Sequence, residues 1–183
     1  MDHQFRRRWE RSASPPCDAW RTEMITKEDM IAFEDIIADE FNAGKIPFPV
    51  HLSSGNEDAL IEIFENVGPD DWIFGSWRMH YHALLRGVSQ QDLRAAICRG
   101  ESMALSFPSK RVYGSAIVGG IIPIALGTAM SIAREGRDET VWCFVGDMTA
   151  ETGIFHECHK YGVNHDLPIK FVIEDNGVSV CTD

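Results

Sequence analysis

The sequence predicts an α/β protein whose doubly wound, mostly parallel sheet is flanked by helices. Residues 141–145 and 169–173 are short apolar runs rich in β-branched and aromatic side chains, as in buried strands. Residues 152–164 between them have helical periodicity, and Pro168 ends that helix. A strand–helix–strand unit of this kind has parallel strands and a right-handed connection. Residues 141–173 therefore predict the fold class.

Composition indicates one globular domain, which we place at residues 23–183 after an irregular, arginine-rich extension over residues 1–22. Hydrophobic residues make up 44% of the chain and charged residues 25%. The net charge of 17 − 28 = −11 disfavours a nucleic acid or an anionic membrane as a partner. No apolar run is long enough to span a bilayer. The 5 cysteines form no C-x-x-C pair, which favours free thiols in a reducing cytoplasm.

Two helices are predicted in the first part of the domain. The first begins at a capping sequence, Thr26 to Asp29, and ends near Gly44. Its predicted inward stripe consists of Met30, Phe33, Ile37 and Phe41. The second begins at a capping box from Ser54 to Glu57. Glu57 is either part of that cap or an acid–base group, and the sequence favours the cap.

The central part of the chain predicts three further helices. Residues 72–85 fit a helix that turns Trp72, Ile73 and Tyr81 inward. Ser89 begins another helix, which Gly100 ends. Residues 107–113 predict a loop. The third helix starts near Pro123 and runs to about residue 134, and its small apolar side chains suit close packing against a sheet or another subunit.

Oxygen-bearing side chains follow the two predicted strands of the first unit. Asp147 comes directly after one strand, and Asn176 follows the other. Because parallel strands present their carboxyl ends at one edge, the two side chains should converge where open α/β sheets bind ligands. Carboxylate and amide oxygens suit Mg²⁺. The alternative is that Asp147 caps the next helix and Asn176 only supplies a turn.

A zinc site on the following helix is a weaker possibility. His156, Cys158 and His159 offer ligands of the right kind, but they lack the H-E-x-x-H spacing.

The segment G-D-M-x-x-E, followed by L-P and E-D-N, resembles the thiamine diphosphate signature. Asp147 and Asn176 are 176 − 147 = 29 positions apart. Together with the segments G-K-I, W-R-x-H and G-x-x-I-V-G, this pattern is similar to the alpha subunits of thiamine-diphosphate-dependent 2-oxo acid dehydrogenases of the pyruvate, branched-chain and acetoin types. The resemblance implies that Asp147, Asn176 and the backbone carbonyl of Val178 bind Mg²⁺.

The same resemblance implies a set of cofactor-binding residues. Arg78 would reach the diphosphate, although from the residue alone a surface ion pair is the alternative. Ile117 would contact the aminopyrimidine ring, and core packing is its alternative. The full implied set is Trp77, Arg78, Ser115, Ile117, Val118, Gly146, Asp147, Met148, Thr149 and Asn176.

The function that the resemblance implies is thiamine diphosphate- and Mg²⁺-dependent decarboxylation or oxidation of a 2-oxo acid. The glutamate that activates the cofactor would come from a beta-type subunit, in a heterotetramer or another oligomer. The chain departs from the family pattern at Trp77, Ala104, Met148 and Asp175, and the pattern stops at Asp183, whereas family members continue. The first alternative is a non-catalytic, split or truncated relative that retains the fold as an assembly subunit. A transketolase-like half-enzyme is a less favoured alternative.

Overall fold

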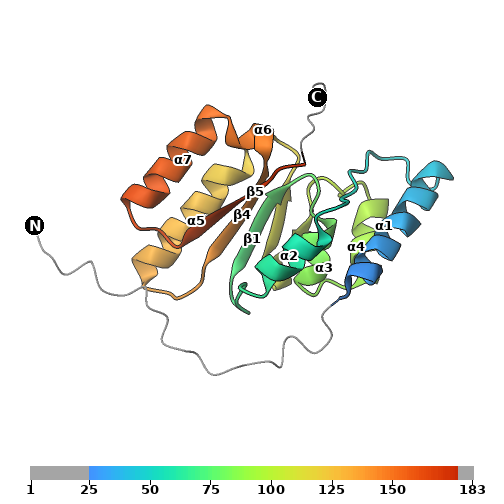
Figure 1. The fold of residues 1–183 in the computed structure, drawn as a ribbon, viewed down its shortest axis with the longest axis horizontal. Helices are drawn as coiled ribbons and strands as arrows, with labels where there is room; N and C mark the ends of the chain where they lie inside the picture. The colour runs from blue at the N-terminus through green and yellow to red at the C-terminus, as the bar shows by residue number, and fades with distance from the viewer. Residues whose placement is uncertain (1–24, 177–183) are drawn as a thin grey trace, which may run out of the picture.

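The computed structural model describes residues 25–176, so the predicted extension over residues 1–22 and Val178 lie outside the described part. A five-stranded sheet with the order β2-β3-β1-β4-β5 forms its centre (Figure 1). Strands β3, β1, β4 and β5 are parallel, and β2 runs antiparallel to β3. The strands are β1 (Trp72–Ser76), β2 (Ser106–Phe107), β3 (Val112–Ser115), β4 (Val141–Gly146) and β5 (Ile169–Glu174). The mostly parallel sheet of the predicted α/β fold is confirmed.

Helices cover both faces of the sheet (Figure 1). The first group is α1 (Lys27–Asn42), α2 (Glu57–Phe64), α3 (His80–Leu85) and α4 (Gln90–Cys98), and the second is α5 (Ile121–Glu135), α6 (Asp147–Ala150) and α7 (Gly153–Asn164), with a short 3₁₀ turn η3 (Pro108–Lys110) before β3. Within residues 25–176, no helix has the length and apolar character needed to cross a membrane.

Each face of the sheet has its own hydrophobic core. Along β4, Trp142 and Phe144 pack in the core under α1–α4, while Cys143 and Val145 pack in the core under α5 and α7. This alternation follows from the two-residue period of a strand, and it explains why a strand buried on both faces is apolar throughout. Burial raises the pKa of the Cys143 thiol to about 12, so this thiol stays protonated inside the second core.

The predicted helix over residues 72–85 is wrong in its first half. Trp72–Ser76 is the central strand β1, and only His80–Leu85 is helical. A continuous apolar run fits both the helical and the extended period, and here pairing with β3 and β4 selects the strand. Glycine at position 75 of this strand leaves room for the Met79 side chain. An added Cβ would lie 2.1 Å from the Met79 sulfur.

Three local predictions also need correction. Phe41 is 46% exposed and lies outside the α1 core stripe, whereas the capping box between Thr26 and Asp29 is confirmed. The capping box at Ser54 is wrong, because α2 begins after Asn56 without a side-chain cap. The predicted loop over residues 107–113 contains the end of β2 and the start of β3, and such short strands have too few residues to show a period.

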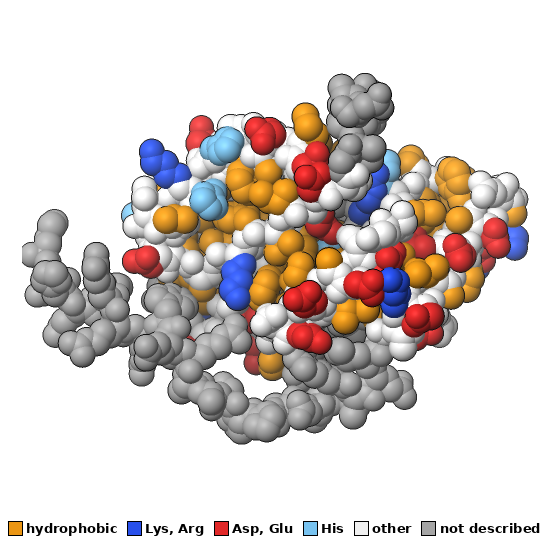
Figure 2. Space-filling model, viewed as in Figure 1, with side chains coloured by type: hydrophobic (Ala, Val, Ile, Leu, Met, Phe, Trp, Pro, Cys, Tyr) orange, Lys and Arg blue, Asp and Glu red, His pale blue; other side chains and the backbone are white. Residues whose placement is uncertain are grey.

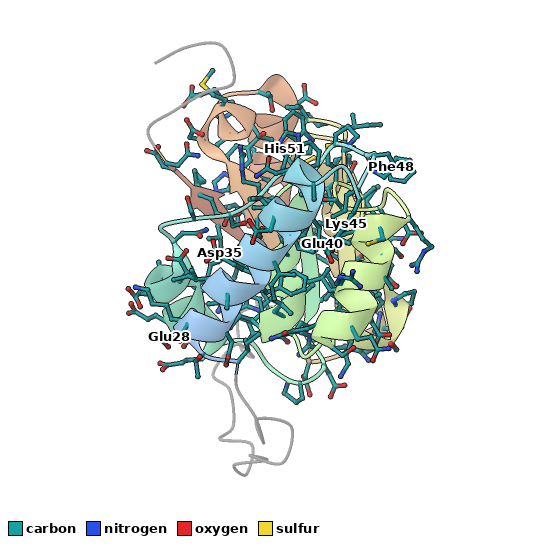
Figure 3. The ribbon with its side chains drawn as sticks, turned by 90° about the vertical axis from the view of Figure 1, so that its right-hand side faces the viewer. Glu28, Asp35, Glu40, Lys45, Phe48 and His51 are labelled. Carbon is teal, nitrogen blue, oxygen red and sulfur yellow. The ribbon has the colours of Figure 1, made fainter. Side chains whose placement is uncertain are left out.

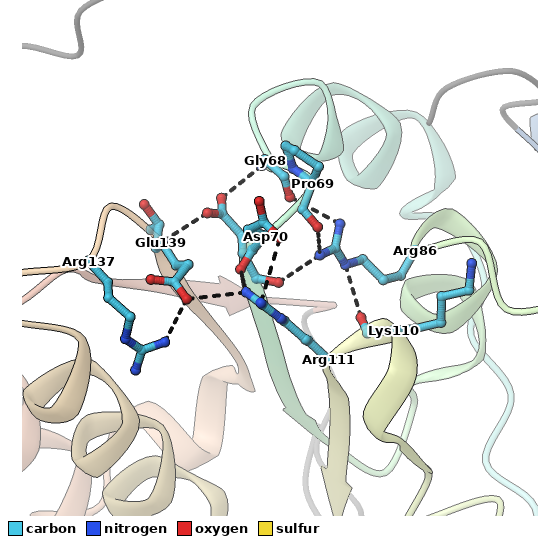
Figure 4. Close-up of polar contacts among 10 residues, drawn as sticks. Gly68, Pro69, Asp70, Arg86, Lys110, Arg111, Arg137 and Glu139 are labelled. Atoms are coloured by element: carbon cyan, nitrogen blue, oxygen red, sulfur yellow. Dashed lines mark hydrogen bonds and ion pairs between the residues drawn. The ribbon is translucent and has the colours of Figure 1, made fainter. Parts of the chain in front are cut away.

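The amino edge of the sheet is held by a network of charged groups (Figure 4). The buried guanidinium of Arg86 donates to the backbone carbonyls of Gly68, Pro69, Asp71 and Lys110 at 2.6–3.1 Å. The Asp71 carboxylate accepts from the backbone N–H groups of Gly68 and Thr140 and from the Trp142 indole. Beside them, Arg111 and Arg137 both pair with Glu139. These bonds connect the turn before β1 to the start of β4.

Substituting Gly75 by alanine should destabilise the fold by about 1–3 kcal/mol, because the added Cβ would force the buried Met79 side chain to shift within the core. Urea unfolding of the two proteins measures the difference. Gly127→Ala is the matched control: this helical position is exposed and an added Cβ meets nothing within 4 Å, so stability should stay equal or rise by up to about 1 kcal/mol. Equal stability of Gly75→Ala and wild type would contradict the close packing of β1 on Met79.

Candidate functional site

The carboxyl ends of four parallel strands form one edge of the sheet. Register pairs the last residues of β1 and β3, Ser76 with Ser115, and the last residues of β4 and β5, Gly146 with Glu174. The loops that follow these strands therefore start level with one another. The chain passes from β1 to β3 on one side of β1 and then to β4 on its other side, so a topological switch point lies between β1 and β4. In open α/β sheets this is the place where ligands bind.

The loop after β1 is held in a strained conformation at Trp77. Its φ of 51° lies in the left-handed region, which costs a non-glycine residue about 1–3 kcal/mol. Two contacts hold the side chain: the indole N–H donates to the Ala116 carbonyl at 2.7 Å, and the ring stacks on His51 with centroids 5.1 Å apart. Figure 3 shows His51 in the segment after α1, beyond Lys45 and Phe48. Three separate segments thus meet at Trp77.

Arg78 extends from the same loop, with its side chain exposed to solvent. Its Nε donates to the Leu52 carbonyl at 3.1 Å, and its own carbonyl accepts from Ser53 Oγ at 3.5 Å. No carboxylate within residues 25–176 forms an ion pair with it. The alternative that Arg78 forms a surface ion pair is therefore not supported by the described residues. The terminal guanidinium nitrogens are left to bind an anion, for which the planar fork of arginine is suited.

The loop after β3 presents apolar side chains at the same edge. Ile117 and Val118 are 71% and 53% exposed, so the core-packing alternative for Ile117 is wrong. The Ser115 hydroxyl accepts from the Ile117 backbone N–H at 3.1 Å and shapes the turn. Gly119 closes the turn at φ 74°, and a Cβ there would approach Ile154 of α7 to 2.7 Å. Glycine at this position lets the loop lie directly against the start of α7.

Asp147 and Asn176 follow adjacent strands, as the sequence predicts. Asp147 is the first residue of α6 and half-buried; Gly146 is the N-cap residue, and no side chain caps this helix. The capping alternative for Asp147 is therefore wrong. Asn176 lies two residues past β5 and is exposed. The other candidates beside Asp147 differ in exposure, since Met148 is 54% exposed and Thr149 is buried.

The donor set at this edge fits a hard cation. Asp147 offers a carboxylate and Asn176 an amide oxygen, and an added Cβ at Gly146 would meet nothing within 4 Å, so there is open space beside Asp147. In the described part of the chain, no group of three or more His, Cys, Asp or Glu side chains is placed to hold a metal ion. His156 and His159 are exposed on α7, and His159 stacks on Phe155. A cation here would rest on one carboxylate with neutral oxygens.

A partly buried polar cluster at the end of β5 had no signal in the sequence. The Glu174 carboxylate accepts from Asn56 Nδ2 at 2.9 Å and lies 3.4 Å from Nε2 of His82, whose ring is fully buried against Phe144. The contact ties the end of β5 to the start of α2 and to α3. Asn56 and Glu174 are 118 residues apart, and no local pattern marks such a pair.

Glu57 has a structural role near the site. It is buried and accepts hydrogen bonds from the Gly55 backbone N–H at 2.9 Å and from the Tyr81 hydroxyl at 3.2 Å. Burial opposes its ionisation, but hydrogen bonds from its own backbone, from Gly55 and from Tyr81 outweigh burial and lower the pKa of Glu57. A carboxylate held ionised in this way supports the turn before α2.

Comparison with known proteins shows the family of this chain. The sequence model of the family described as "Dehydrogenase E1 component" matches residues 25–183. The chain belongs to this family. The match covers all the strands and loops of the site described above.

Individual E1 relatives include enzyme subunits from algae, plants and bacteria. The alpha subunit of the pyruvate dehydrogenase E1 component of Porphyra purpurea is 34% identical over 84% of this chain and 50% of its own length. The chloroplastic pyruvate dehydrogenase E1 component subunit alpha-3 of Arabidopsis thaliana is 32% identical over 81% of this chain and 39% of its own length. The alpha subunit of acetoin:2,6-dichlorophenolindophenol oxidoreductase of Bacillus subtilis is 30% identical over 82% and 48%. The chain thus spans half or less of the length of these E1 relatives.

The stability of the E1-family chain should fall in mild acid because of His51. Burial, and then electrostatic repulsion from Arg78 and the neighbouring His80, lowers the pKa of His51 from its ordinary value of 6.5. Near and below pH 6.5 the unfolded chain is protonated at this position to a greater extent than the folded chain, so the free energy of unfolding decreases as the pH falls through this window.

Denaturant unfolding of wild type and His51→Asn across this pH range measures the effect. Once the pH-independent difference at pH about 8 is subtracted, the variant should lose less stability in acid than wild type. Parallel pH profiles of the two proteins would show that His51 titrates normally in the folded chain.

Proposed function

We propose that this chain is the thiamine diphosphate- and Mg²⁺-dependent, alpha-type subunit of an enzyme that decarboxylates and oxidises a 2-oxo acid. The observation that supports it best is that Asp147 and Asn176 follow the adjacent parallel strands β4 and β5, while Arg78 follows β1, the other neighbour of β4. The names of the relatives, pyruvate dehydrogenase and acetoin oxidoreductase alpha subunits, agree with a 2-oxo acid or a related substrate.

Each residue in the proposed site has a specific task. Asp147, Asn176 and the carbonyl of Val178, which lies outside the described residues, would hold Mg²⁺. Arg78 would donate two parallel hydrogen bonds to the diphosphate. The exposed side chains of Ile117 and Val118 would exclude water from the organic rings, with Trp77, Ser115, Gly146, Met148 and Thr149 as further contacts. When bound, thiamine diphosphate supplies the carbanion and electron-sink chemistry.

A partner subunit is part of the proposal. The relatives are named as alpha subunits, and apolar side chains of Ile117, Val118 and Met148 stand exposed around the edge that would hold the cofactor. Apolar groups that face solvent beside a binding site suit a surface that a second chain covers. We propose a beta-type subunit in a hetero-oligomer, with the activating glutamate on that subunit.

We also propose a cytoplasmic location for this chain. Cys98, Cys143 and Cys158, the cysteines of the described part, are free thiols. Free thiols are usual in a reducing compartment.

A non-catalytic assembly subunit is the second candidate, and Met148 is the observation that favours it. Its side chain is 54% exposed directly beside Asp147, where the family pattern has glycine. A side chain at this point competes for space with a diphosphate that approaches the backbone. Cofactor binding separates the two functions.

Calorimetric titration of thiamine diphosphate into the chain, with Mg²⁺ and with EDTA, tests the proposal. We expect binding in the micromolar range that requires Mg²⁺ and disappears in Asp147→Ala, because the cation then loses its carboxylate ligand. Arg78→Ala should weaken binding about 10–100-fold through the loss of charged hydrogen bonds worth about 1.5–3 kcal/mol.

Two variants serve as controls for charge and folding. Arg134→Ala removes an exposed group in the last turn of α5, and Asp138→Ala removes one on the connection from α5 to β4. Both variants should bind like wild type. If wild type fails to bind thiamine diphosphate with Mg²⁺ even when a beta-type E1 subunit is added, the catalytic proposal is wrong and the assembly role is favoured.

A further inference from the structure

A buried histidine–carboxylate pair lies behind the Arg78 loop. The His80 ring is fully buried at the first position of α3, and its Nδ1 is 3.0 Å from Oε1 of Glu34, which is 4% exposed. Since an ionised carboxylate only accepts, Nδ1 carries the proton. Nε2 of His80 lies 2.9 Å from the hydroxyl of Ser102, which is also fully buried. Both ring nitrogens are therefore engaged.

The same carboxylate oxygen is connected to Arg78 through a second segment. Glu34 Oε1 accepts from the Ser53 backbone N–H at 3.3 Å. Ser53 Oγ donates to the Arg78 carbonyl, and the neighbouring Leu52 carbonyl accepts from Arg78 Nε. Glu34 thus contacts the two stretches of chain that hold Arg78: the residues beside its guanidinium, and His80 two positions further along its own backbone.

The arrangement has a cost that hydrophobic packing would avoid. Burying a carboxylate is unfavourable unless donors compensate it, and Oε2 of Glu34 has no hydrogen-bond partner among the described residues. Apolar side chains in place of the whole pair would fill the same interior without burying a charge. A buried charge with a directional network around it is better suited to fix geometry than to add stability.

We propose that Glu34 and His80 are positioning residues for Arg78, which hold its guanidinium in the orientation that binds the cofactor diphosphate. This inference rests on the proposed function, because it gives Arg78 the diphosphate as its ligand. Neither Glu34 nor His80 needs to touch the cofactor, since their influence passes through Leu52, Ser53 and the backbone of α3.

A double-mutant cycle on the full chain separates positioning from general structural support. Glu34→Gln removes the charge and keeps the shape, and thiamine diphosphate with Mg²⁺ is titrated by calorimetry. We expect Glu34→Gln to weaken binding about tenfold when Arg78 is present, as for the loss of a charged hydrogen bond. In the Arg78→Ala background the same substitution should change binding less than about twofold, because the group that it positions is gone.

Glu57→Gln is the matched control for burial. Glu57 is a second buried glutamate, 5% exposed, whose bonds go to Gly55 and Tyr81 and not to the Arg78 loop. The Glu57→Gln variant should lower the thermal unfolding midpoint, as Glu34→Gln does. It should change cofactor affinity by less than about twofold, both with Arg78 present and in the Arg78→Ala background. This comparison shows whether the loss of cofactor affinity in Glu34→Gln comes only from reduced stability of the fold.

Substitutions of His80 test the direction of the contact. Asparagine can offer an amide N–H near the place of Nδ1, and glutamine near the place of Nε2. His80→Asn should therefore retain more affinity for the cofactor than His80→Gln, because it preserves the bond toward Glu34.

The outcomes separate this inference from the proposed function. The positioning role would be overturned if Glu34→Gln weakened cofactor binding equally with and without Arg78. It would also be overturned if His80→Gln retained more cofactor affinity than His80→Asn. Neither result would affect the proposal that the chain binds the cofactor. Failure of wild type to bind the cofactor would overturn the proposed function and this inference with it.

Discussion

Parallel pairing of β4 with β5 and β1 is the constraint on which the site depends. The β4–β5 ladder runs from Val141 opposite Ile169 to Gly146 opposite Glu174. A slip by one residue would exchange the side chains that face the two cores, placing Trp142 and Phe144 where Cys143 and Val145 now fit. Core packing on both faces therefore fixes the register, and the register fixes where Asp147 and the residues after Glu174 emerge.

Polar anchors then fix the loops that the sheet only brings near one another. The strained Trp77 is held by the Ala116 carbonyl and by His51, and the end of β5 is held by Asn56. A loop with few apolar contacts opens at low free-energy cost, so directional bonds to buried groups are an effective way to keep a binding geometry.

How much of this could be predicted from sequence depended on how far apart the interacting residues lie. The unit β4–α7–β5 and the place of Asp147 followed from a local pattern, because two short apolar runs flank a segment with a clear helical period. The central strand β1 was missed, since its apolar residues fit a helix equally well and only pairing with β3 and β4 decides. Contacts such as Glu34 with His80 join residues 46 positions apart and depend on the assembled fold.

The two edges of the sheet differ in a way that separates stability from function. At the amino edge, Arg86 and Asp71 use their polar atoms on backbone groups of neighbouring segments, which closes the fold and leaves little for a ligand. At the carboxyl edge, Arg78 has no carboxylate partner among residues 25–176, and Ile117 and Val118 face solvent. A chain optimised only for stability would pair that charge and bury those side chains. These features coincide at the switch point of the sheet, which is why we propose a ligand and a partner surface there.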